Sequence, residues 1–222
     1  MISTAGSQSG TVGNLSITAP DRINLQTGSQ ITSRSTGTGN GGTVEITGRL
    51  LVLNQNAQIN ASTVASNGGN LLLNLSEFLR QSDHSVLNAQ AGDTGNGGNI
   101  SINAPFIIGS GNSDSIANAV RGHGGNIKIT TNSILGLDFR NQLTPDNDIT
   151  ASSEFGVNGT VQITTPQVNP NFGLVELPVN LVDSYQLIAI GCANTNDSSF
   201  VATERGGIPQ NPTQDMRRAP LV

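Results

Sequence analysis

The feature of this sequence that most constrains its fold is a repeated glycine turn, usually Gly-Gly, followed by a short strand of alternating apolar and polar residues. The six copies read GNLSIT, GGTVEIT, GGNLLLN, GGNISIN, GGNIKIT and NGTVQIT. Their last glycines recur at intervals of 29, 27, 29, 27 and 34 residues: Gly13, Gly42, Gly69, Gly98, Gly125 and Gly159. Self-similarity at such a period is typical of solenoids, propellers and other repeat architectures.

A second marker, an apolar residue opening another strand, keeps the same period. It falls at intervals of 29, 28, 28, 29 and 33 residues: Ile2, Ile31, Ile59, Leu87, Ile116 and Ile149. The spacing of both markers increases in the last interval, which indicates an insertion there. The agreement between two independent markers supports a true repeat.

Each period also holds a third apolar stretch, at residues 22–25, 50–53, 78–79, 106–108 and 134–137. Three short strands separated by Gly and Asn corners describe one coil, because alternating strands bury one face and glycine supplies the positive φ of sharp turns. The sequence therefore predicts an all-β fold, a right-handed parallel β-helix of about six coils with three strands per coil. A sandwich or propeller is the main alternative, but a propeller blade needs about 40 residues and four antiparallel strands.

Equivalent positions of successive coils should stack. The inward core is predicted to be a column of aliphatic residues: Val44, Ile46, Leu71, Leu73, Ile100, Ile102, Ile127, Ile129, Val161 and Ile163. One corner is predicted to form a structural ladder, in which asparagine amides hydrogen bond from coil to coil. Its members are Gly42, Gly69, Asn70, Gly98, Asn99, Gly125, Asn126 and Gly159.

The two ends of the chain differ. Ile2 is already in phase with Ile31, so we expect this chain to be the C-terminal piece of a longer polypeptide, because an uncapped β-helix exposes unpaired backbone. The predicted organisation is β-helix at 1–165, a C-terminal cap at 166–204, where prolines interrupt the repeat, and a flexible tail at 205–222.

Composition narrows the possible partners. Only 11% of residues are charged, against about 25% in ordinary domains, and the net charge is −5. Nucleic acid is excluded as a partner because no basic stripe exists, and no transmembrane segment is predicted because no long apolar run exists.

Four segments together resemble the C-terminal end of the large haemagglutinin-like exoproteins of cyanobacteria, which belong to the filamentous haemagglutinin class of two-partner secretion proteins. They are GNGGNISINAPFIIG, LGLDFRNQLTPDNDITASSEFGVNGTVQITTP, GLVELPVNLVDSYQLIAIGCA and SSFVATERGGIPQNP. The resemblance covers essentially the whole chain. It implies a secreted or outer-membrane-displayed adhesin, exported by an outer-membrane transporter that partners the parent protein. The family's signal peptide and secretion domain have no counterpart in these residues.

The function expected from this resemblance is a non-enzymatic structural stalk that binds cell-surface or matrix glycans weakly and multivalently. The alternative is a fragment of a polysaccharide lyase or hydrolase, which would need acids on one groove. The densest charged group is in the insertion DFRNQLTPDND: Asp138, Arg140, Asp146 and Asp148. A long loop on a rigid coil is where function is grafted, although Pro145 among these residues also describes an ordinary turn.

No catalytic, cofactor or metal site is predicted. Asp93 is an isolated acid, unlike the regularly placed Asp of calcium-binding β-rolls, and His84 and His123 lack a second ligand at metal spacing. Cys192, the only cysteine, is interpreted as a small buried apolar residue, with a thiol that links to another chain as the alternative.

Overall fold

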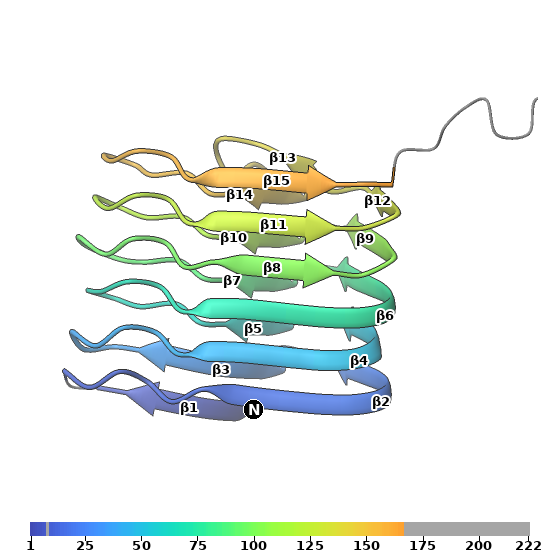
Figure 1. The fold of residues 1–222 in the computed structure, drawn as a ribbon, viewed down its shortest axis with the longest axis horizontal. Coiled ribbons are helices and arrows are strands. Elements are labelled where there is room, and N and C mark those ends of the chain that lie inside the picture. The colour runs from blue at the N-terminus through green and yellow to red at the C-terminus, as the bar shows by residue number, and fades with distance from the viewer. Residues whose placement is uncertain (8, 167–222) are drawn as a thin grey trace, which may run out of the picture. The chain divides into compact units, whose positions relative to one another are not determined.

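The computed structural model describes residues 1–7 and 9–166, which form fifteen strands and no helix. The strands are parallel and stack into a β-solenoid of about five turns, which confirms the predicted parallel β-helix (Figure 1). The predicted cap at 166–204 and tail at 205–222 lie outside the described residues, apart from Pro166.

One sheet, called sheet A here, contains the strands that carry the second sequence marker. Its spatial order is β1 (Ile2–Gly6), β3 (Gln30–Ser35), β5 (Gln58–Asn60), β7 (Val86–Asn88), β10 (Asp114–Ile116), β14 (Asp148–Thr150) and β13 (Asp138–Phe139).

The other sheet, sheet B, contains the strands that follow the glycine turns. They are β2 (Leu15–Leu25), β4 (Thr43–Leu53), β6 (Asn70–Ser82), β8 (Ile100–Asn103), β9 (Phe106–Ser110), β11 (Asn126–Thr130), β12 (Ser133–Leu135) and β15 (Thr160–Thr164). In the first three coils one long strand supplies two sides of the coil, bending at a register shift between Ala19 and Arg22 and again between Gly48 and Leu50. In the next two coils the two sides are separate strands.

The predicted aliphatic column lines the interior. Leu71, for example, pairs with Val44 on one side and Ile100 on the other, and all three are at most 1% exposed. Each such side chain contributes about 1.5–3 kcal/mol by leaving water. The last described rung is less covered: Val161 is half-buried and Ile163 is 38% exposed.

The Gly-Gly turns require glycine because neighbouring coils approach closely there, and not because the turns need positive φ. Positive φ occurs at only three of the described glycines, Gly28, Gly111 and Gly136, and none belongs to a Gly-Gly pair. A Cβ added to Gly98 would instead lie 2.8 Å from the carbonyl carbon of Gly69 and would overlap its oxygen. The prediction that these pairs supply positive φ is therefore wrong; they permit close approach between coils.

Positive φ is found at another corner, the one leading into sheet A. Four successive coils place two adjacent left-handed residues there: Thr27 and Gly28, Gln55 and Asn56, Asp83 and His84, Gly111 and Asn112. Gly, Asn and Asp tolerate this conformation best, and they occupy five of the eight positions.

One sequence marker is out of register by a residue. Ile116 pairs with Asn88 and Thr150, whereas Ser115 pairs with Leu87 and Ile149. Ser115 is buried, and its hydroxyl donates to Oε1 of the buried Gln81 at 3.2 Å. A satisfied polar pair thus replaces two aliphatic residues in the core, a substitution that apolar periodicity does not reveal.

The asparagine corner makes hydrogen bonds from coil to coil. Asn99 Nδ2 donates to Asn70 Oδ1 at 3.0 Å, and Asn126 Nδ2 donates to Asn99 Oδ1 at 3.2 Å. The Thr160 hydroxyl continues the series by donating to Asn126 Oδ1 at 2.7 Å. The side chains at this corner are exposed or half-buried, so the ladder ties neighbouring coils together at the surface.

Candidate functional site

The insertion that lengthens the last repeat leaves the solenoid at the corner before sheet A. Gly136, with φ of 75°, turns the chain, and Leu137 inserts its side chain above Gly109 in the coil below. β13 then pairs in parallel with β14, with Asp138 opposite Asp148 and Phe139 opposite Ile149. The insertion therefore adds a short strand to the outer edge of sheet A before the chain returns to the repeat.

The four charged residues predicted as a loop site do come together, and Arg140 is their centre. Its Nη1 lies 2.5 Å from Oδ1 of Asp148, and its Nη2 lies 3.4 Å from carboxylate oxygens of Asp138 and Asp146. Asp148 is fully buried, and its carboxylate also accepts hydrogen bonds from the backbone N–H and hydroxyl of Thr144. The hydrogen bond to Asp148 is the main cause that raises the pKa of Arg140. These contacts clamp the loop onto the solenoid.

A further carboxylate lies beneath this clamp. The backbone N–H of Asp148 donates to Asp114 Oδ1 at 2.9 Å. Burial is the main cause that raises the pKa of Asp114, and the neighbouring Asp148 carboxylate raises it further. The two carboxylates lie on successive rungs, where the like charge of Asp148 disfavours the ionised form of Asp114.

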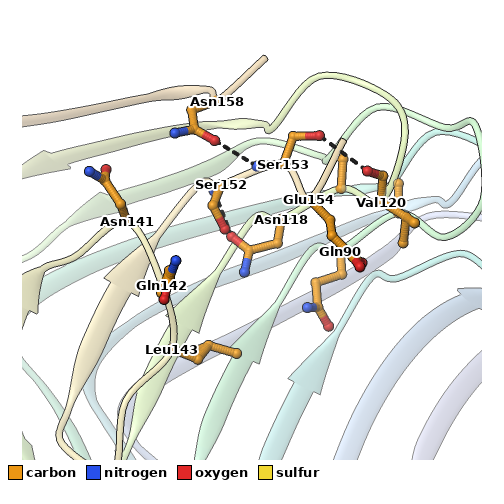
Figure 2. Close-up of a pocket in the computed structure, with 12 residues that line it drawn as sticks. Gln90, Asn118, Val120, Asn141, Gln142, Leu143, Ser152, Ser153, Glu154 and Asn158 are labelled. Atoms are coloured by element: carbon orange, nitrogen blue, oxygen red, sulfur yellow. Dashed lines mark hydrogen bonds between the residues drawn. The ribbon is translucent and has the colours of Figure 1, made fainter. Parts of the chain in front are cut away.

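The clamped loop overhangs a cleft of about 520 Å³, bounded on the other side by the outer segments of three coils (Figure 2). Its polar lining comes from the loop and from those coils: Gln90, Asn118, Asn141, Gln142, Ser152 and Asn158. Leu143 and Val120 supply apolar surface, and Glu154 is the one acid that the described residues contribute to the lining. The cleft thus combines amides and hydroxyls with apolar side chains.

Part of this polar surface is fixed by internal hydrogen bonds and part is free for a ligand. Asn118 Oδ1 accepts from the backbone N–H of Ser152 at 2.8 Å, and Asn158 Oδ1 accepts from that of Ser153 at 2.8 Å (Figure 2). The side-chain amides of Gln90, Asn141 and Gln142, by contrast, make no hydrogen bond to other residues in the described part of the chain. Each free amide offers two donors and one acceptor to a hydroxylated ligand.

The remaining sequence candidates lie apart from the cleft. Asp93 forms an exposed ion pair with Arg121 at 2.7 Å. His84 is exposed at a left-handed corner, and His123 is exposed in the loop before β11, where its backbone N–H donates to Asn96 Oδ1. Among residues 1–7 and 9–166 no three His, Cys, Asp or Glu side chains are grouped to hold a metal ion. Cys192 lies outside the described residues.

In comparisons with known proteins, no family model, no curated protein and no solved structure matches the chain. Within the described residues, no helix has the length and hydropathy needed to cross a membrane.

The sequence did not predict most of the residues that line the cleft. The predicted loop site contained the charged residues of the insertion and left out the amide side chains of the same insertion. The repeat does carry a signal, because Gln90 and Asn118 are 28 residues apart and so occupy equivalent positions of adjacent coils. Asn141 and Gln142 follow Arg140 directly, and the clamp orients them.

Proposed function

We propose that this chain is a stiff, non-enzymatic segment of a secreted or surface-displayed adhesive exoprotein, and that the cleft under the insertion binds a neutral glycan. The observation that carries the proposal is the lining of the cleft, where uncharged amides and hydroxyls alternate with apolar side chains, the two kinds of group that the hydroxyls and C–H faces of a sugar contact. Sugar hydroxyls both donate and accept hydrogen bonds, which matches the free amides of Gln90, Asn141 and Gln142.

The fold supports the mechanical half of this proposal. A continuous ladder of parallel strands forms a rod in which each coil contacts its neighbours, so a binding cleft is held at a fixed place along it. Repeated display of such rods on a surface would raise the avidity of individually weak sites. The resemblance to the filamentous haemagglutinin class adds an outer-membrane transporter as the proposed export partner of the parent protein.

The acids near the cleft favour binding over glycoside hydrolysis. Hydrolases use two carboxyl groups on either side of the scissile bond, whereas residues 1–7 and 9–166 line this cleft with one, Glu154. The acids of the insertion are already ion-paired through Arg140.

A binding experiment on the full chain tests the proposal. Neutral oligosaccharides would be screened by glycan array, and hits measured by calorimetry, for the wild type and the double variant Asn141→Ala/Gln142→Ala. Loss of two to four hydrogen bonds should weaken binding by about tenfold or more with the melting temperature unchanged, because both side chains are exposed.

The matched control is Asn132→Ala/Gln162→Ala, which removes the same two side chains from exposed positions outside the cleft lining. Equal weakening in both double variants would reject the cleft as the binding site. Release of reducing ends that disappears in Glu154→Gln would replace the proposal with the enzymatic alternative.

A further inference from the structure

A second concavity lies on the outer face of sheet B, over the second halves of β2, β4 and β6, with a volume of about 270 Å³. Two arginines line it, Arg22 on β2 and Arg80 on β6. In register, Arg22 pairs with Leu50, which pairs with Phe78, while Asn24 pairs with Val52, which pairs with Arg80. The arginines therefore lie diagonally on either side of Val52. Two strand spacings and a rise of two residues put their Cα atoms about 12 Å from each other.

Among the described residues, these two guanidinium groups have no carboxylate partner, unlike three other arginines of the solenoid. Arg49 binds Asp21 and Glu77, Arg121 binds Asp93, and Arg140 binds three aspartates. Neither Arg22 nor Arg80 forms an ion pair with a carboxylate in residues 1–7 and 9–166.

Among the residues that the structure describes, no acid lines the concavity, and Asp21, the acid next to Arg22 in sequence, is ion-paired with Arg49. Two unpaired cations in one hollow of a protein with a net charge of −5 mark a place where an anion is favoured.

The rest of the lining suits a sugar ring better than a small inorganic anion. Phe78 is half-buried and lines the hollow beside the two arginines, so its exposed edge offers an apolar surface to the C–H face of a sugar. Asn24 and Gln26 are exposed and make no side-chain hydrogen bond to other described residues, which leaves their amides free for hydroxyl groups.

The floor of this hollow is rigid. Ser82 is 3% exposed, and its hydroxyl lies within hydrogen-bond distance of two acceptors, Leu53 O at 3.3 Å and Asn54 Oδ1 at 3.1 Å. Both Ser82 and Asn54 line the hollow, so its base is preorganised while the arginine side chains above remain free to close on a ligand.

We propose that this hollow binds an anionic sugar residue, whose carboxylate or sulfate is held by Arg22 and Arg80, whose ring packs against Phe78, and whose hydroxyls bind the Asn24 and Gln26 amides. A guanidinium group can pair two N–H donors with two oxygens of one anion, whether a planar carboxylate or a tetrahedral oxyanion such as sulfate, which makes it selective for such groups. The site is distinct from the neutral cleft at the insertion and lies on different coils. Binding at one site can therefore be tested independently of binding at the other.

The test uses the full chain and three probes of similar size measured by calorimetry: oligogalacturonate, sulfated dextran oligosaccharide and neutral maltohexaose. We expect at least one anionic probe to bind and maltohexaose not to compete for the same site. Preference between the first two identifies carboxylate or sulfate as the anion. Affinity should fall as sodium chloride is raised, because both arginines are exposed.

The variants Arg22→Gln and Arg80→Gln should each weaken anionic binding by about tenfold or more, since each removes charged hydrogen bonds. Arg34→Gln is the control, because it makes the same change in net charge at an exposed arginine on sheet A and should leave binding unaltered. Asn141→Ala/Gln142→Ala should also leave it unaltered.

Three results would overturn the proposal. They are binding of neither anionic probe, equal weakening by Arg34→Gln, and equally tight binding of a single-stranded oligonucleotide, which would indicate attraction to charge without recognition of a sugar.

Discussion

Replacing Gly98 by alanine should weaken the contact between the third and fourth coils of the solenoid. The added Cβ would lie 2.8 Å from the carbonyl carbon of Gly69 and 2.9 Å from that of Gly68, and would overlap the Gly69 oxygen. Carbon atoms in contact prefer about 3.5 Å, so the two coils must separate locally by roughly 0.7 Å or more. No flexible side chain is available to move, because the obstructing atoms belong to the backbone.

The cost follows from what that separation disturbs. Overpacking of this kind costs about 1–3 kcal/mol. The shift also stretches hydrogen bonds between the two coils at the same corner: Gly68 N–H to Asn96 O at 2.8 Å, and Leu71 N–H to Asn99 O at 2.8 Å. At about 1 kcal/mol for each, the total is about 3–5 kcal/mol, which corresponds to a fall in melting temperature of roughly 6–20 °C for a chain of this size.

The measurement is thermal unfolding followed by circular dichroism, with hydrogen exchange to locate the damage. Exchange should accelerate in β6 and β8, which flank the altered contact, because coils in a solenoid are stabilised mainly by their neighbours. The control is Gly10→Ala, where nothing lies within 4 Å of the added Cβ. Equal melting temperatures for the two variants would refute the close-approach explanation of the glycine column.

Two further predictions concern the clamp. Arg140→Met should destabilise the protein by about 3 kcal/mol, because it leaves the fully buried Asp148 carboxylate without its cation, and Arg140→Met/Asp148→Asn should recover much of that loss in a double-mutant cycle. Failure of the second change to compensate would mean that the ion pair is not what holds the loop. Asp114→Asn should raise the melting temperature at pH 7 but not near pH 3. The raised pKa means that the folded state prefers the protonated acid, so wild-type stability falls as pH rises through that pKa, whereas an amide stays neutral and its oxygen still accepts from Asp148 N–H. A lower melting temperature of this variant at pH 7 would contradict this account.

Much of the solenoid was predictable because a repeat imposes the same environment on equivalent residues. Leu71, Leu73 and their counterparts follow from alternation and period alone. The period also located the Gly-Gly pairs. The reason that glycine is needed there is the short distance between neighbouring coils, which the sequence of a single coil does not specify. Ser115 shows the converse: a core position can be polar when Gln81 in the coil below satisfies it.

The cleft was less predictable than the coils. The insertion has no counterpart in the other repeats, so its path over Asn118 and Ser152 is set by Arg140 and the buried Asp148, which are tertiary contacts. The arginine pair on sheet B was likewise not predicted, because Arg22 and Arg80 lie 58 residues apart in sequence, in different columns two coils apart, and only the register between coils brings them to one hollow.

The pairing of β13 with β14 also affects how such molecules can meet. An exposed strand edge recruits foreign strands, and a parallel solenoid presents one in each sheet at its end. At β14 that edge is already occupied by the chain's own Asp138 and Phe139, so a foreign strand at this end of sheet A would have to pair with β13. β13 has only two residues, and very short edge strands limit such pairing. At high concentration, molecules with this feature would therefore offer one another only a short strand edge at this end of sheet A, and the loop that supplies it is the one that shapes the cleft.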